Sequence, residues 1–153
     1  MAVIIGALRE SVPQEMRVSV VPETADKFVQ AQARILLEHG AGASAQFPDA
    51  SYHQVEWATA ASVLAQANVL LTVQPPSVAV IQALKPGTTV VGFMQPYAHS
   101  SEVKALRDGR ITAFAMELVP RISRAQSMHA FSSQASIAVR TGAGTVLHTG
   151  DIK

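Results

Sequence analysis

The sequence contains no cysteine and carries little charge. The absence of cysteine among 153 residues excludes a disulfide framework, a thiolate metal site and a cysteine nucleophile. Charged residues make up 15% of the chain and the net charge is +1, so no basic field directs the protein to nucleic acid. The hydrophobic fraction of 48% indicates a well-buried globular domain instead.

Long apolar runs are absent as well. The longest, such as residues 68–73, are too short to span a bilayer. Residues 1–6 show neither the basic leader nor the apolar core of a signal peptide. We therefore expect a cytoplasmic protein with no direct membrane insertion, in which any link to a membrane is made through a partner.

Short β-branched apolar runs alternate along the chain with segments of helical period. Strands are predicted over residues 3–7, 35–38, 69–73, 88–94 and 112–116. Helices are predicted over residues 23–31, 49–57, 61–67, 78–84 and 101–107. The alternation predicts an α/β fold, a Rossmann-like or flavodoxin-like three-layer domain with a mostly parallel sheet. Ligands of such sheets bind beyond the carboxyl ends of the strands.

The last stretch of the chain departs from this pattern. Residues 137–141 and 145–149 alternate in polarity around Gly142-Ala143-Gly144, which predicts a C-terminal β-hairpin. A dinucleotide fingerprint would need a third glycine that enters a helix, and Leu147 occupies that place. We therefore divide the chain into a domain over 1–136 and a hairpin tail over 137–153 within the same compact unit.

Two polar loops follow predicted strands and are candidates for binding. Residues 9–18 include Arg9 and Arg17, which could meet an anion or simply be solvated. The second loop carries Arg121, Arg124 and Gln126. An arginine fork can grip a carboxamide or a phosphate, and glutamine can donate and accept. The alternative is a helix start with exposed arginines, and the residues alone leave both interpretations open.

A metal site is not predicted. His148 and Asp151 lie close together in the tail, but a metal site needs three or four ligands with supporting groups. The other histidines show no ligand spacing.

From residue 3 to about residue 138 the chain resembles the first half of the alpha subunit, the NAD(H)-binding component, of proton-translocating NAD(P) transhydrogenase. That family is related to alanine dehydrogenase. The matching segments are residues 6–10, 17–24, 38–42, 47–52, 73–76, 84–87, 113–117 and 119–134. The most specific is the loop that begins Val119-Pro120-Arg121-Ile122-Ser123-Arg124-Ala125-Gln126-Ser127-Met128.

The resemblance implies a domain that packs against a separate NAD-binding domain, with the nicotinamide in the cleft between them. Hydride then passes to NADP held by another component. Arg121 matches an arginine that contacts the nicotinamide end of NAD(H), and Gln126 matches a glutamine that bridges toward the second nicotinamide. Ser132 matches a serine near the carboxamide, and His129, which replaces an aspartate of the family, completes the predicted cofactor-binding set. No residue is predicted as a catalytic acid or base, because the cofactor carries the reactive carbon.

The sequence departs from the family pattern at several positions. Thr72 stands where relatives usually have a lysine, which in alanine dehydrogenases meets the substrate, so alanine dehydrogenase activity is not expected. Gln32 replaces a glycine at the end of the first helix, a position that suits a left-handed residue. Glu56 also replaces a glycine. After Ala138 the relatives continue into the NAD-binding domain, so we expect NAD to bind weakly or only with a partner domain.

The tail has a resemblance of its own. Residues 138–153 resemble a strand pair of ribonucleases in the metallo-β-lactamase class, in which Asp151 would match a metal ligand. The histidine-rich motif that supplies the other ligands is missing. A join between unrelated sequences near residues 129–138, as in a chimera, is therefore one hypothesis.

Three functional hypotheses follow. The first is a portion of a transhydrogenase alpha subunit, inactive alone, that serves hydride transfer between NAD(H) and NADP(H) coupled to proton translocation. Its partners would be an NAD-binding domain or other transhydrogenase subunits. The second is a non-enzymatic chimeric or truncated folding unit that binds a partner or forms a homodimer through the tail. The third, metal-dependent nucleic-acid chemistry from the tail, has the least support.

Overall fold

A computed structural model describes residues 2–120, 122, 136–141 and 144–149. The chain forms two units, Met1–Ala115 and Met116–Lys153. The first unit holds a parallel α/β sheet and the second holds the β-hairpin. The predicted domain boundary after residue 136 stays a prediction.

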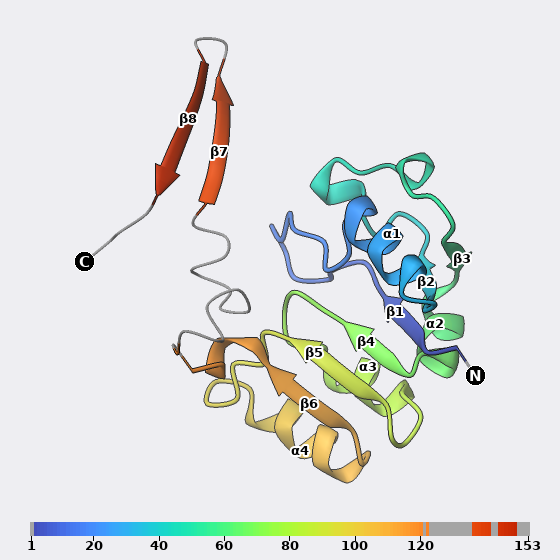
Figure 1. The fold of residues 1–153 in the computed structure, drawn as a ribbon. Coiled ribbons are helices and arrows are strands. Elements are labelled where there is room, and N and C mark those ends of the chain that lie inside the picture. The colour runs from blue at the N-terminus through green and yellow to red at the C-terminus, as the bar shows by residue number, and fades with distance from the viewer. Residues whose placement is uncertain (1, 121, 123–135, 142–143, 150–153) are drawn as a thin grey trace. The chain divides into compact units, whose positions relative to one another are not determined.

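The first unit is built on six parallel strands in the order β3-β2-β1-β4-β5-β6 (Figure 1). The strands are β1 Ile4–Ala7, β2 Arg34–Glu38, β3 Glu56–Ala58, β4 Val69–Leu71, β5 Thr89–Gly92 and β6 Thr112–Ala115. The chain winds outward in both directions from β1, which pairs with β2 on one side and β4 on the other. All six strands therefore end at the same edge of the sheet, and the α/β Rossmann-like prediction is confirmed.

Four α-helices connect the strands. They are α1 Pro22–Gln30, α2 Ala60–Gln66, α3 Val78–Ala83 and α4 Ser100–Asp108. Their starts follow from local chemistry: Pro22 occupies the first turn of α1, and the side chains of Thr59 and Ser77 accept backbone N–H groups at the starts of α2 and α3. Short 3-10 turns lie at η1 Ala43–Ala45, η2 Asp49–Ser51 and η3 Met116–Leu118.

The core has one cluster on each face of the sheet. Leu36, Leu70 and Val90 pack with residues of α2, α3 and α4. Ile35 and Leu37, which alternate with Leu36 along β2, pack with residues of α1 on the other face. Nearly continuous apolar strands are what a parallel sheet covered on both faces requires.

Two backbone positions depend on particular residues. A Cβ atom at Gly6 would lie 2.8 Å from Val63 and 2.9 Å from Ala67, so α2 packs directly on β1 because Gly6 has no side chain. Gln32, predicted to be left-handed, has a φ of 64°. Its conformation matches the expectation for a residue that replaces glycine after the first helix.

The helix predicted over residues 49–57 is wrong. That segment is the η2 turn followed by β3, which pairs with Leu36–Glu38 of β2. The Asp49 carboxylate accepts the Gly40 N–H, and the buried Tyr52 hydroxyl donates to the Val20 carbonyl. These long-range contacts favour the turn over a helix that the local pattern suggested.

The C-terminal hairpin is present as an antiparallel pair. β7 Ser136–Thr141 pairs with β8 Gly144–Thr149, with Thr141 opposite Gly144. Residues 142–143 between the strands lie outside the described residues.

Candidate functional site

The four residues predicted to contact the cofactor, Arg121, Gln126, His129 and Ser132, lie outside the described residues, as does Arg124. Their roles stay predictions. Among the described neighbours, Ile122 donates its N–H to the carbonyl of Pro120 at 2.9 Å.

The loop after β1 is tied to the ends of neighbouring strands. Arg9 donates its N–H to the Glu38 carboxylate at the end of β2, at 2.8 Å. The Glu10 carboxylate accepts the N–H groups of Val73 and Gln74 beyond β4, at 2.6 and 3.2 Å. Since β2, β1 and β4 are neighbours, these contacts fasten the loop across the centre of the carboxyl edge.

A second carboxylate completes this polar network. Glu15 accepts two hydrogen bonds from the Arg17 guanidinium, each at 2.7 Å, and a third from the Gln74 amide at 2.6 Å. The Gln95 amide, beyond β5, donates to the Gln74 side-chain oxygen at 3.4 Å. We call Glu10, Glu15, Arg17, Gln74 and Gln95 the edge network.

The edge network gives Arg17 a structural role within residues 9–18. Arg17 is bound to Glu15 in a bidentate pair, and its guanidinium lies 5.9 Å from the centre of the Phe93 ring. Its side chain is 48% exposed, so it stabilises the loop from the surface while it stays in contact with solvent. Anion binding by Arg9 stays a prediction.

The pKa values of the two carboxylates of the edge network are shifted in opposite directions. Burial raises the pKa of Glu10, and the two N–H groups it accepts offset this only in part. The Arg17 guanidinium lowers the pKa of Glu15 to about 2. The Arg17 cation therefore stabilises the ionised form of Glu15, whereas two backbone N–H groups favour the ionised form of Glu10.

Thr72 lies next to this network, directly after β4. Its hydroxyl oxygen is buried and has no hydrogen-bond partner among the described residues. A Cβ atom at Gly92 would overlap the carbonyl and hydroxyl oxygens of Thr72. Thr72 therefore packs directly against β5 at a position that only glycine can occupy without a clash. Thr72 is thus a short, uncharged side chain packed against the sheet.

Exposed apolar side chains surround the same edge. Tyr97, which follows β5, is 94% exposed, and Met16 and Val12, which follow β1, are 61% and 43% exposed. Large apolar side chains around an ordered polar centre are characteristic of a surface that another protein domain covers.

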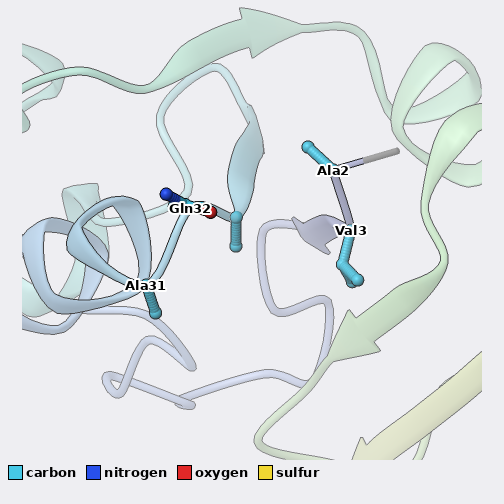
Figure 2. Close-up of a pocket in the computed structure, with 5 residues that line it drawn as sticks. Ala2, Val3, Ala31 and Gln32 are labelled. Carbon is cyan, nitrogen blue, oxygen red and sulfur yellow. The ribbon is translucent and has the colours of Figure 1, made fainter.

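The opposite, amino edge of the sheet carries the exposed Arg34–Glu56 ion pair, which joins the starts of β2 and β3. A hollow of about 370 Å³ is lined there by Ala2, Val3, Ala31, Gln32 and Ala33 (Figure 2). None of these side chains titrates, and only Gln32 is polar. The hollow therefore supplies no acid, base or ionic ligand group.

Sequence reasoning missed the roles of the edge network. In the sequence, Glu10 and Gln74 were noted as matches to the family, and no contact between their loops was predicted. The available signal was their placement, because Glu10, Gln74 and Gln95 each follow a strand by three residues, and strand ends converge at the ligand edge of a parallel sheet.

Metal ligands and membrane-spanning helices are both absent from the described residues. No group of three or more histidine or acidic side chains within them could hold a metal ion. No helix in the same residues is long and apolar enough to cross a membrane.

Comparison with known proteins gives consistent results. Residues 6–138 match the family model of the alanine dehydrogenase/PNT N-terminal domain. The chain is 35% identical over 140 residues to the first component of NAD(P) transhydrogenase subunit alpha of Rickettsia prowazekii, a match that covers 87% of this chain. It is 37% identical over 142 residues to the same component from Rhodospirillum rubrum, covering 88% of this chain.

A solved structure agrees with the sequence matches. The transhydrogenase of Sinorhizobium meliloti superposes with a TM-score of 0.81 at 34% identity, over 94% of this chain and 49% of that one. The chain spans 37% of the length of the two curated relatives.

Proposed function

Because this chain belongs to the alanine dehydrogenase/PNT family, whose N-terminal domain it matches, we propose that it forms one wall of a hydride-transfer site on the NAD(H) side of a transhydrogenase. The observation that carries the proposal is the carboxyl edge of the sheet. The edge network there is internally paired, and Tyr97 and Met16 are exposed beside it.

The chemistry of this edge fits the nicotinamide end of a dinucleotide better than its pyrophosphate. Among the described residues, Arg17 is bound to Glu15, and two carboxylates lie close by. Carboxylates repel phosphate, whereas an uncharged carboxamide or a cationic ring is compatible with them. We therefore propose that NAD binds weakly to this domain alone and that a separate NAD-binding domain holds the phosphates.

The residues proposed to orient the nicotinamide are Arg121, Gln126, His129 and Ser132. Bound NAD would supply the carbon that accepts or releases hydride. The side chains would hold the carboxamide, set the approach of the two rings and exclude water. No acid or base is required of the protein.

The proposed partners are an NAD-binding domain and other transhydrogenase subunits. In this assembly the domain would lie on the cytoplasmic side and reach the membrane only through those subunits. Coupling of hydride transfer to proton translocation would then be a property of the whole assembly, and the 153 residues alone would be inactive.

The alternative proposal is a non-enzymatic folding unit that binds a partner through the same edge. The exposed Tyr97 and Met16 fit this role as well as the enzymatic one. The two proposals differ in whether the predicted cofactor residues contribute to the affinity for nucleotide.

A calorimetric titration with NADH separates them. We expect heat of binding only when an NAD-binding domain of a transhydrogenase alpha subunit is added to the chain. In that mixture Arg121→Ala should weaken NADH binding, whereas Arg110→Ala, at an exposed arginine near the start of β6, should not. If Arg121→Ala leaves the affinity unchanged while the domains still associate, the non-enzymatic proposal is favoured.

A further inference from the structure

Methionine is the only residue type in this chain whose side chain contains sulfur. The sequence has no cysteine and five methionines, so a peroxide that reaches the protein acts on thioethers. Three of the methionines, Met16, Met94 and Met116, lie within the described residues. Met94 is buried at 5% exposure, Met116 is partly buried, and Met16 is 61% exposed. Because the oxidant must reach the sulfur, Met16 is the reactive member of this set.

Hydrogen bonds of the candidate site hold Met16 toward solvent. The residues on either side of it are tied together, because the Glu15 carboxylate accepts the backbone N–H of Arg17 at 3.0 Å and its guanidinium at 2.7 Å. A turn precedes this pair: Glu15 donates its N–H to the carbonyl of Val12 at 3.1 Å, and Gln14 has a left-handed φ of 66°. The Glu15 side chain is 6% exposed and points inward, so the next residue along the chain, Met16, presents its side chain to solvent.

We propose that Met16 is an oxidation site at the carboxyl edge of the sheet and that its oxidant is a peroxide. In the reaction the sulfur lone pair attacks one peroxide oxygen, an S–O bond forms and the O–O bond breaks. The proton of the transferred oxygen passes to the departing hydroxide, which leaves as water when the oxidant is hydrogen peroxide. The sulfur is oxidised to the sulfoxide and the peroxide is reduced, so no further redox partner is required.

Oxidation of Met16 changes the chemistry of the carboxyl edge. A flexible apolar side chain becomes polar, among the exposed apolar side chains of Val12 and Tyr97 that surround the edge network. A sulfoxide that is buried in an interface without a hydrogen-bond donor is unfavourable. This consequence rests on the proposed function, in which an NAD-binding domain covers the edge. Oxidation then lowers the affinity for that domain, and reduction by a methionine sulfoxide reductase restores it.

Treatment of the chain with hydrogen peroxide, followed by digestion and mass spectrometry at successive times, tests the site itself. In the folded chain we expect Met16 to gain oxygen faster than Met94 by about tenfold or more, because Met94 is buried. In urea the two rates should become equal, since unfolding exposes both side chains. Equal rates in the folded chain, or a faster reaction at Met94, would overturn the proposal.

The affinity of a transhydrogenase NAD-binding domain for the chain, measured before and after oxidation of the chain and removal of the peroxide, tests the consequence. Oxidation should weaken the wild-type association by about threefold to tenfold. The control is Met16→Leu, which has no sulfur at this position and should bind with the same affinity before and after treatment. An equal loss in the wild type and in Met16→Leu would assign the effect to another methionine and overturn the proposal.

The two measurements separate this inference from the proposed function. If the NAD-binding domain does not associate with the chain even before oxidation, the proposed function fails. The relative oxidation rates of Met16 and Met94 are measured on the chain alone, so they still decide whether Met16 is the oxidation site.

Discussion

The two ends of the parallel sheet are built from the same strands but carry different chemistry. At the carboxyl end, Glu10 and Glu15 tie the loop after β1 to the loop after β4, and Gln95 after β5 donates to Gln74 of that loop. At the amino end, a hollow is lined almost wholly by methyl groups. The hollow has no ionic group in its lining, whereas the carboxyl end joins three loops through hydrogen-bonded polar side chains. A polar network that joins several loops marks the candidate site in this domain.

The largest expected effect concerns the packing of β5 at the carboxyl end. Gly92→Ala would force a methyl group into the oxygens of Thr72, and we expect a loss of about 3 kcal/mol in the free energy of unfolding. Gly87→Ala, at the amino end of β5, meets open space but has a φ of +86°, and should cost about 1 kcal/mol. Urea denaturation measures both. Equal losses of unfolding free energy in the two variants would mean that Thr72 can move aside at little cost.

The edge network should contribute more to stability than an exposed ion pair. Glu15→Gln removes the negative charge and one of the two acceptor oxygens of the Arg17 pair from a side chain that is only 6% exposed, and should cost about 2 kcal/mol. The control is Glu23→Gln, in the exposed pair with Lys27 on α1, which should change stability little. Similar denaturation midpoints for the two variants would show that the edge network is not a brace.

The same network makes a prediction for pH. The pKa of Glu15 is lowered to about 2 in the folded chain, so its stabilisation is present above its unfolded pKa and is lost as the pH falls toward 2. The pKa of Glu10 is raised, so its contribution has the opposite sign: it is fully present below the unfolded pKa and is lost as the pH rises through the folded pKa.

Melting temperatures from about pH 2 to pH 7 measure this difference. Glu15→Gln should flatten the loss of stability in acid, and Glu10→Gln should steepen it. Parallel curves for the wild type and both variants would contradict the opposite assignments.

The smallest expected effect lies at the outer part of the carboxyl edge. The imidazole of His39, directly after β2, stacks on the only tryptophan, Trp57, with ring centres 5.7 Å apart. Removal of the stacked imidazole should change the environment of the indole, so His39→Gln should alter the tryptophan emission, whereas His53→Gln, at another exposed histidine, should leave it unchanged. Identical emission spectra of the wild type and His39→Gln would contradict the stack.

The fold was largely predictable because the apolar strands and the helix-period segments differ clearly in their local pattern. Five of the six strands of the sheet were expected from that pattern. β3 was missed because a three-residue strand that begins with Glu56 has no apolar alternation, and its identity depends on pairing with β2. Gln32 was placed correctly because a left-handed position after a helix has a steric requirement that resemblance to a family reveals.

The candidate site was less predictable than the fold. The contacts of Glu10 with Val73 and of Glu15 with Gln74 join residues 63 and 59 positions apart, so no local pattern contains them. Arg17 is available for a ligand as far as the sequence shows, and only the folded loop shows that Glu15 occupies it. The roles of Arg121 and Gln126 stay predictions.

If the carboxyl edge is the surface on which an NAD-binding domain docks, its exposed apolar residues should contribute to the affinity. The most direct measurement compares the affinity of such a domain for the wild-type chain and for two charge variants of exposed apolar residues, Tyr97→Asp at the carboxyl edge and Val3→Asp at the amino edge. We predict that Tyr97→Asp weakens association by about tenfold or more and that Val3→Asp leaves it unchanged. Equal affinities for the wild type and Tyr97→Asp, or a loss confined to Val3→Asp, would contradict docking at this edge.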